Sequence, residues 1–216
     1  MRSTIVIIKS GWKNKARRDA QRATWLPYLR LPHKFVVGKR KVKAYGENPM
    51  ANPENEPNML ILPVSDARMD LSPKIKGACE WALENGYTQM VVLDDDTFVD
   101  TARLADYCER AFALGKDYVG FQGPNREWMS GSAYIISISA MRILSVAPEL
   151  KDNTHDDIQT GLALKGRVIW EHTEKFNVGP VPEPLPLPDN EIITAHKCLP
   201  DVMREVSTRH TMAFGK

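Results

Sequence analysis

Val91–Asp100 reads VVLDDDTFVD, and this apolar run ending in three aspartates decides the fold class. With the residues before it, the stretch 88–96 (TQMVVLDDD) has the composition of a buried strand. Strand-like and helix-like segments alternate over the first 120 residues, which predicts a parallel sheet in an α/β fold. Ligands bind beyond the carboxyl ends of the strands in such sheets. The aspartates therefore mark the expected site.

The segments around this strand can be assigned from their patterns of apolar, glycine and proline residues. We expect further strands at residues 3–8, 33–38, 59–64, 117–121 and 167–172, and a bent one at 127–139 where Gly and Ser interrupt the apolar run. We expect helices at 13–25, 72–86, 101–115 and 155–166. In the second of these, Ser72 is the expected N-cap, Pro73 the first helical residue and Gly86 the stop. Five prolines within 180–188 predict an extended segment.

Length and composition indicate one ordinary globular domain. The chain has 216 residues, of which 43% are hydrophobic and 26% charged, and no apolar run approaches eighteen residues. The first apolar run, IVII, is short enough for a strand and too short for a signal peptide. Cys79, Cys108 and Cys198 form no CxxC pair, which favours reduced thiols. We therefore expect a cytoplasmic protein without a membrane span, in the host cytoplasm if the source is viral.

Charge is distributed unevenly along the chain. Residues 1–43 contain thirteen Lys and Arg and a single acid, Asp19, although the net charge of the whole chain is only +2. This pattern favours an anionic ligand near the first third and a metal near the acidic remainder, although a solvated basic face is the simpler alternative.

Three adjacent carboxylates, Asp94, Asp95 and Asp96, need a cation, because like charges at this spacing repel one another. Oxygen ligands of this kind suit Mg²⁺ or Mn²⁺, with phosphate oxygens completing the coordination. The alternative, that the acids only begin the next helix, explains one aspartate better than three. The alternating acids and the glycine of a calcium-binding EF-hand loop are missing.

Five segments in order resemble the β-1,3-galactosyltransferase and Fringe group of inverting, metal-dependent glycosyltransferases. They are ARRDAQRATW (16–25), DARMDLSPK (66–74), LDDDTFV (93–99), SGSAYIIS (130–137) and DDIQTG (156–161). The second keeps Asp66 and Lys74 of its family pattern but has Arg68 for Tyr and Asp70 for Asn. The resemblance implies a single-domain glycosyltransferase-A (Rossmann-like) fold with a mostly parallel central sheet flanked by helices. It also implies a nucleotide diphosphate sugar donor, with uridine favoured, and Mn²⁺ or Mg²⁺ as cofactor.

The resemblance also assigns residues to roles. Asp94, Asp96 and His196 become the metal ligands, with His172 as the competing histidine. Asp157 becomes the general base, with Asp156 as the alternative, although Asp157 also stands three residues after Thr154 in the manner of a capping box. The expected donor-binding residues are Arg17, Arg18, Arg22, Asp66, Lys74, Asp94, Asp95 and Gly131.

Within the single domain 1–216 we expect a nucleotide-sugar-binding half, 1–120, and an acceptor and catalytic half, 121–216, with a Pro-rich loop at 179–190. The predicted activity is transfer of a hexose or pentose to an acceptor hydroxyl. The acceptor would be a glycan or, given the basic first third, a hydroxylated base in modified DNA of viral type. A nucleotidyltransferase is the alternative enzyme, but KSGWKNKARR (9–18) lacks its Gly-rich phosphate loop. A non-catalytic nucleotide-sugar-binding module is the third possibility.

Overall fold

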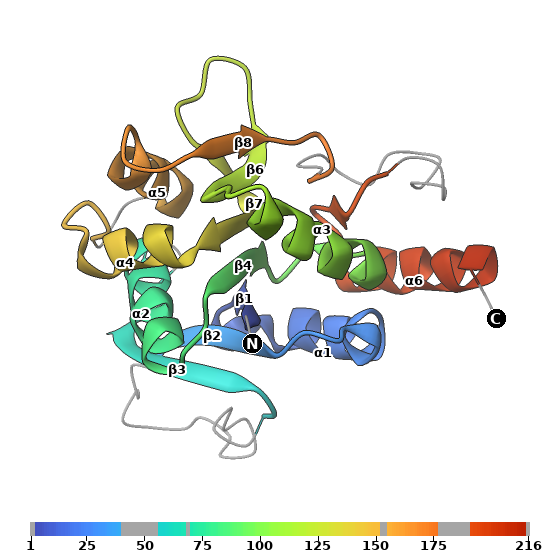
Figure 1. Cartoon of the computed structure of the whole chain (residues 1–216). Coiled ribbons are helices and arrows are strands. Elements are labelled where there is room, and N and C mark those ends of the chain that lie inside the picture. Colours follow the sequence, from blue (N-terminus) through green and yellow to red (C-terminus); the bar gives the residue numbers. More distant parts are fainter. Residues whose placement is uncertain (1–2, 40–55, 68–69, 152–154, 177–190, 215–216) are drawn as a thin grey trace, which may run out of the picture.

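The structure is a computed structural model, and it describes residues 3–39, 56–67, 70–151, 155–176 and 191–214 (Figure 1). A seven-stranded sheet in the order β3-β2-β1-β4-β7-β6-β8 forms its centre, and β5 and β9 make a separate two-stranded sheet. The strands of the large sheet are β1 (Thr4–Lys9), β2 (His33–Lys39), β3 (Met59–Ser65), β4 (Gln89–Asp94), β6 (Tyr118–Gln122), β7 (Met129–Ser137) and β8 (Trp170–His172). The small sheet pairs β5 (Phe98–Val99) with β9 (Thr194–Ala195) in antiparallel register.

The large sheet is mostly parallel, as predicted. Strand β1 pairs in parallel with both β2 and β4, β2 with β3, and β6 with β8. Strand β7 is the exception, because it runs antiparallel to both of its neighbours, β4 and β6. Only residues 123–128 join β6 to β7, and a parallel connection would need a longer crossover. The chain is therefore a single α/β domain with one reversed strand.

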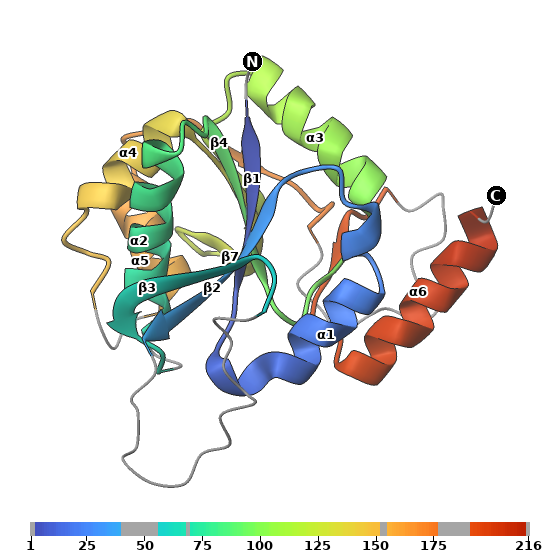
Figure 2. The same cartoon turned by 90° about the horizontal axis from the view of Figure 1, so that it is seen from below.

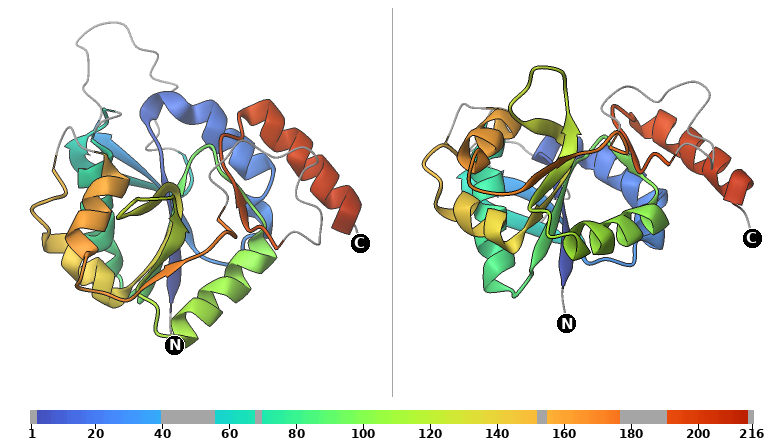
Figure 3. Two further views of the ribbon diagram at one scale, coloured as in Figure 1. Left: turned by 90° about the horizontal axis from the view of Figure 1, so that it is seen from above. Right: turned by 45° about the horizontal axis from the view of Figure 1, so that its top comes forward.

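Helices cover both faces of the sheet (Figure 2). On one face lie α2 (Leu71–Glu84), α4 (Ile138–Val146) and α5 (Asp156–Leu164), and on the other lie α1 (Lys15–Ala23), α3 (Thr101–Ala113) and α6 (Pro200–Phe214). Figure 3 shows α6 alongside α1, a contact that brings the C-terminal part of the chain next to its N-terminal part.

Strands β1 and β4 are buried on both sides, and their side chains alternate between two apolar cores. Toward α2, α4 and α5 point Ile5, Ile7, Met90 and Val92. Toward α1, α3 and α6 point Val6, Ile8, Val91 and Leu93. The last residues of the two strands, Lys9 and Asp94, continue the first of these series. A lysine and an aspartate therefore end two apolar stripes that face the same helices.

Two helix starts differ from the sequence predictions. A 3₁₀ turn, Trp12–Asn14, precedes α1, so the α-helix begins at Lys15 and is shorter than predicted. Helix α2 begins at Leu71 after the N-cap Asp70, so Ser72 and Pro73 are its second and third residues. A proline is tolerated there because the first-turn N–H groups of a helix have no acceptor in the helix. The predicted stop is confirmed, since Gly86 follows α2 with a φ of 76°.

Some sequence predictions fall outside the described residues, namely the Pro-rich loop 179–190 and Thr154, whose place before α5 is taken by the N-cap His155. The three cysteines are free and buried. Among the described residues, none of the helices combines the length and the apolar character that a bilayer span requires.

Candidate functional site

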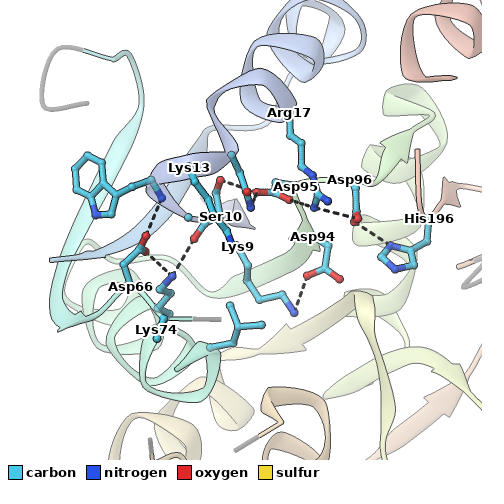
Figure 4. A pocket seen from close by; sticks show the side chains of 15 residues that line it. Lys9, Ser10, Lys13, Arg17, Asp66, Lys74, Asp94, Asp95, Asp96 and His196 are labelled. Atoms are coloured by element: carbon cyan, nitrogen blue, oxygen red, sulfur yellow. Dashed lines mark hydrogen bonds and ion pairs between the residues drawn. The ribbon is translucent and has the colours of Figure 1, made fainter. Parts of the chain in front are cut away.

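A polar cavity of about 570 Å³ opens where β1 and β4 end (Figure 4). Its walls come from the end of β1 and the start of α1, from the β3–α2 connection, from the three aspartates after β4, and from the segment after β9. The lining residues are Lys9, Ser10, Gly11, Trp12, Lys13, Asn14, Arg17, Asp66, Ala67, Leu71, Lys74, Asp94, Asp95, Asp96 and His196. The cavity therefore lies at the carboxyl ends of parallel strands, where the sequence predicted the site.

Lys9 and Asp94 face each other because β1 and β4 are parallel neighbours in register. The Lys9 Nζ lies 3.0 Å from Asp94 Oδ1 and 2.5 Å from Asp156 Oδ2, and it donates a 2.8 Å hydrogen bond to the Gly131 carbonyl. Only 3% of Lys9 is exposed. One buried cation thus connects β1, β4, β7 and α5.

The charges around Lys9 do not balance. Burial lowers the pKa of Lys9, but the carboxylates of Asp156 and Asp94 outweigh burial and raise that pKa above its ordinary value. Burial raises the pKa of Asp94, and the nearby Asp156 raises it further against the pull of Lys9. Two carboxylates therefore share one ammonium, which leaves an excess negative charge that a bound cation would compensate.

The middle aspartate of the triplet holds the loop before α1 in place. Asp95 is 4% exposed, and its carboxylate accepts hydrogen bonds from Ser10 Oγ at 2.7 Å, Asn14 Nδ2 at 2.8 Å and Arg17 Nη1 at 2.9 Å. Ser10 reaches it because side chains alternate along β1 and β4, so that Ser10 and Asp95 lie on the face opposite to Lys9 and Asp94. Asp95 thus orients the residues that line the cavity.

The outer aspartates meet a histidine from the far end of the chain. One ligand atom from each of Asp94, Asp96 and His196 can be chosen so that all three lie within 4.8 Å of one another. The Nδ1 of His196 lies 3.3 Å from Asp96 Oδ1, and the pairing of Phe98 with Ala195 places this histidine next to the triplet. Burial lowers the pKa of His196, with Asp96 opposing, and a lowered pKa favours the neutral imidazole that a metal binds.

His172, the competing histidine of the sequence analysis, lies elsewhere. It is on β8, where its Nδ1 accepts a hydrogen bond from Gln122 N and its Nε2 faces Glu174. It does not line the cavity.

The three predicted arginines separate into two groups. Arg17 lines the cavity and bridges Asp95 and Asp96 with Nη1, at 2.9 and 3.1 Å. Arg18 does not line the cavity; it binds Glu56 through two nitrogens, each at 3.0 Å, and its Nη1 donates to the Gly11 carbonyl at 2.6 Å. Arg22 contacts the same glutamate at 2.9 Å. Adjacent helical residues differ in direction by about 100°, so Arg17 and Arg18 do not share a face.

Replacing Glu56 should test what Arg18 does in the fold. Arg18 is 1% exposed, and Glu56→Gln would leave its buried charge without a carboxylate. We expect a loss of about 3 kcal/mol in the free energy of unfolding at neutral pH, measured by urea unfolding. Glu127→Gln, which breaks the exposed pair with Lys165, should cost less than about 0.5 kcal/mol.

The Glu56 pair should also contribute to acid unfolding. Burial alone would raise the pKa of Glu56, but Arg18 and Arg22 lower it to about 2, against an ordinary value of 4.5. A depressed pKa gives stability that is present above the ordinary value and is lost as pH falls toward 2. The free energy of unfolding should therefore fall more steeply from pH 5 to pH 2 in the wild type than in Glu56→Gln. Equal slopes would contradict this role.

Asp66 and Lys74, both predicted to bind donor, form the other wall of the cavity. Lys74 Nζ lies 2.7 Å from Asp66 Oδ1 and donates to the Ser10 carbonyl at 2.9 Å. Asp66 also accepts from the backbone N–H groups of Trp12 at 2.7 Å and Gly38 at 2.8 Å. Only glycine fits at position 38, because a Cβ there would lie 2.3 Å from the Ser65 carbonyl oxygen. The bulge at Gly38 thus fixes Asp66.

The two acids at the start of α5 have different surroundings. Asp156 is buried and paired with Lys9, whereas Asp157 is half-buried and accepts a hydrogen bond from Ile158 N. Asp157 stands next to β7, because a Cβ on Gly131 would lie 3.3 Å from the Cβ of Asp157; the same Cβ would lie 3.4 Å from the Nζ of Lys9. Gly131, predicted to bind donor, does not itself line the cavity, and a side chain there would crowd Asp157 and Lys9.

Sequence reasoning missed Lys9, Ser10, Lys13 and Asn14 as lining residues. The available signal was their position, since all four lie at or just after the carboxyl end of the first predicted strand. A lysine that follows four apolar β-formers was a candidate on that ground alone.

No family model matches the sequence, and no curated protein is significantly similar to it. Among solved structures, the fold resembles the glycosyltransferase GlyE of Streptococcus pneumoniae TIGR4, with a TM-score of 0.58 and 12% identity over 96% of this chain; the match spans 60% of GlyE. It also resembles a glycosyltransferase involved in the glycosylation of the major capsid of PBCV-1, with a TM-score of 0.54 and 10% identity over 97% of this chain and 99% of that one. At such identities the likeness shows the fold alone, which is of the glycosyltransferase-A type.

Proposed function

We propose that this chain is a metal-dependent glycosyltransferase that moves a sugar from a nucleoside diphosphate sugar to an acceptor hydroxyl with inversion. The group Asp94, Asp96 and His196 carries the proposal, because it opens into a polar cavity that also contains Lys13, Arg17 and Lys74. Acidic ligands next to basic side chains suit a ligand made of a cation and a diphosphate together. The position of the cavity beyond the carboxyl ends of β1 and β4 supports the proposal, because open α/β sheets bind ligands there.

The ligand set fits Mn²⁺ or Mg²⁺. Two carboxylates and a neutral imidazole are oxygen and nitrogen donors, and three protein ligands leave positions open for water and phosphate oxygens. When bound, such a cation supplies Lewis-acid neutralisation of the departing diphosphate. The excess negative charge around Lys9 favours the same occupant.

The basic side chains of the cavity would bind the rest of the donor. Arg17 holds Asp95 and Asp96 in the structure and has a second guanidinium nitrogen for a phosphate oxygen. Lys13 is exposed in the 3₁₀ turn before α1 and lines the same wall. Asp66 lies farther from His196 and would contact the nucleoside, and Lys74, which is 1% exposed and bound to Asp66, would hold that carboxylate in place (Figure 4). The resemblance to the β-1,3-galactosyltransferase group favours uridine there.

Asp157 is the proposed general base, and Asp156 the residue that supports it. Asp156 is buried and its carboxylate is paired with the Lys9 ammonium, so it cannot approach an acceptor hydroxyl. Asp157 stands beside it, is half-buried, and has one carboxylate oxygen outside its bond to Ile158 N. The acceptor oxygen would bond to the anomeric carbon on the side opposite to the diphosphate and lose its proton to Asp157 as the bond to the diphosphate breaks, which would invert the configuration in one step.

The two halves predicted from the sequence also suit this function. Every lining residue of the cavity belongs to 1–120 except His196. Asp156, Asp157 and Gly131 belong to 121–216. We therefore assign donor binding to the first half, and acceptor activation and one metal ligand to the second.

The test begins with binding. Thermal unfolding in the presence of uridine, guanosine, cytidine and thymidine diphosphates, each with Mn²⁺, Mg²⁺ or EDTA, should show stabilisation by one nucleotide only when the cation is present. His196→Ala should lose this effect, while His172→Ala should keep it. Equal nucleotide affinity with and without EDTA would contradict the proposal, because bare phosphates would then face the three aspartates unaided.

The second step is the reaction. The preferred nucleotide defines sugar donors whose cation-dependent hydrolysis can be measured by release of the nucleoside diphosphate. Glycan acceptors and hydroxymethylated DNA are then offered separately, and NMR of the product reads the anomeric configuration. Retention of configuration would contradict the role of Asp157 as the base of a single displacement.

A further inference from the structure

Lys9 has all of its hydrogen-bonding capacity in use inside the protein. A lysine ammonium has three donors, and Lys9 has three acceptors, Asp156 Oδ2, the Gly131 carbonyl and Asp94 Oδ1, at 2.5, 2.8 and 3.0 Å. It lines the cavity, but with 3% exposure it has no room to turn toward a substrate. Its effect on a ligand must therefore pass through the residues that it holds.

The residue it holds at the cavity is Asp94, one of the three proposed metal ligands. The Lys9 ammonium contacts Oδ1 of this carboxylate on the side facing α5. Figure 4 shows Asp94 between the Lys9 ammonium and His196. A carboxylate that chelates a metal with both oxygens must turn both toward it. A cation bound to Oδ1 as well as Oδ2 would lie beside the Lys9 ammonium 3.0 Å from that oxygen, and the repulsion between the two positive charges disfavours this mode.

The other carboxylates at the site are restricted in the same way. Asp96 directs Oδ2 to Arg17 and Oδ1 toward His196, and Asp95 accepts from Ser10, Asn14 and Arg17. Asp94 is thus the member of the triplet whose binding mode depends on a single buried cation.

We propose that Lys9 determines the cation selectivity of this site by limiting Asp94 to one metal-binding oxygen, which disfavours Ca²⁺ relative to Mg²⁺ and Mn²⁺. Ca²⁺ takes six to eight oxygen ligands and often binds a carboxylate through both oxygens, whereas Mg²⁺ takes an octahedral set of single oxygens. Lys9 is a positioning residue in this account. The inference rests on the metal site of the proposed function.

The test is cation binding to the nucleotide-free protein. The EPR signal of bound Mn²⁺ is titrated with Mg²⁺ and with Ca²⁺, which gives the ratio of their dissociation constants. The variant is the double replacement Lys9→Met/Asp156→Asn, which removes one positive and one negative charge and so keeps the net charge of the site. We expect the Ca²⁺-to-Mg²⁺ ratio of dissociation constants to fall about tenfold in this variant, which is the size of the change in metal affinity when a residue that orients a metal ligand is lost.

Asp156→Asn alone is the matched control. It leaves Lys9 in contact with Asp94 and Gly131, so the ratio should stay within about twofold of the wild type. A tenfold fall in the control as well would assign the effect to the loss of Asp156, which both variants share, and overturn the proposal. An unchanged ratio in the double variant, with Mn²⁺ binding intact, would overturn it too.

A measurement on the wild type decides the matter if the double variant does not fold. The proposal requires the wild type to bind Mg²⁺ more tightly than Ca²⁺, so equal or tighter binding of Ca²⁺ overturns it. If the wild type binds no Mn²⁺ even with a nucleoside diphosphate present, the proposed metal site itself fails. That outcome is distinct from a normal site whose selectivity does not depend on Lys9.

Discussion

Asp96→Ala should reduce cation-dependent sugar transfer by at least about a thousandfold, equivalent to about 4 kcal/mol of lost transition-state stabilisation. The expected loss is large because Asp96 is a proposed metal ligand and also holds Arg17 at 3.1 Å. Removing the Asp96 side chain would weaken binding of the metal and loosen the placement of Arg17, the two positive groups proposed to face the diphosphate. Initial rates at saturating Mn²⁺ and donor, together with Mn²⁺ affinity from EPR, measure the two effects separately.

The same substitution should hardly change the fold. The contact of Asp96 that positions the C-terminal segment is made by its backbone carbonyl, which accepts from Cys198 N at 2.8 Å and remains after truncation. Asp100→Ala is the control. It removes the side chain that caps α3 through Arg103 N and should cost about 1 kcal/mol of stability, but should leave turnover unchanged at a temperature where the variant stays folded. If Asp96→Ala kept substantial activity, the assignment of Asp96 as a metal ligand would be wrong.

Asp157→Asn should lower turnover by about a hundredfold or more, the usual contribution of a general base, and leave donor affinity within about twofold. Asparagine keeps an amide oxygen that can accept the hydrogen bond from Ile158 N, so the start of α5 is preserved while the basic group is lost. Single-turnover rates and isothermal titration with the nucleoside diphosphate measure the two quantities.

The two readings of Asp157 give opposite results in this variant. If Asp157 only begins the helix, the amide should replace it with full activity, and Asp157→Ala should lower the melting temperature without lowering the rate. If Asp157 is the base, both variants should be inactive and the asparagine variant should melt near the wild type. Activity in Asp157→Asn that matches the wild type would reassign the base.

The parallel half of the sheet could be predicted because its strands are continuous apolar runs that alternate with helices. The reversed strand β7 could not be derived from apolar pattern alone, since Tyr134 and Ile136 would be as buried in a parallel strand. The usable signal was the short connection 123–128, which leaves no space for a crossover helix. Strand type was thus readable from composition, and strand direction from the length of the loop.

The candidate site could be predicted only where the residues lie close in sequence. The aspartates 94–96 are adjacent, so their mutual repulsion is visible in the sequence. The partner of Lys9 in α5 lies 147 residues along the chain, and nothing local indicates that contact. Arg17 and Arg18 look equivalent as neighbours, yet helix geometry directs one to the cavity and the other to Glu56.

The short pairing of β5 with β9 has a consequence for the end of the chain. Thr194 and Ala195 are paired with Val99 and Phe98, and this pairing helps to hold His196 beside the triplet. If docking of β9 strengthens cation binding through His196, cation binding must stabilise the docked β9 by the same free energy, because coupling between two equilibria is reciprocal. Local opening of this segment would move His196 away from a bound cation while the seven-stranded sheet stayed folded. Occupancy of the site and amide-exchange protection of residues 194–198 are thus two measures of one equilibrium.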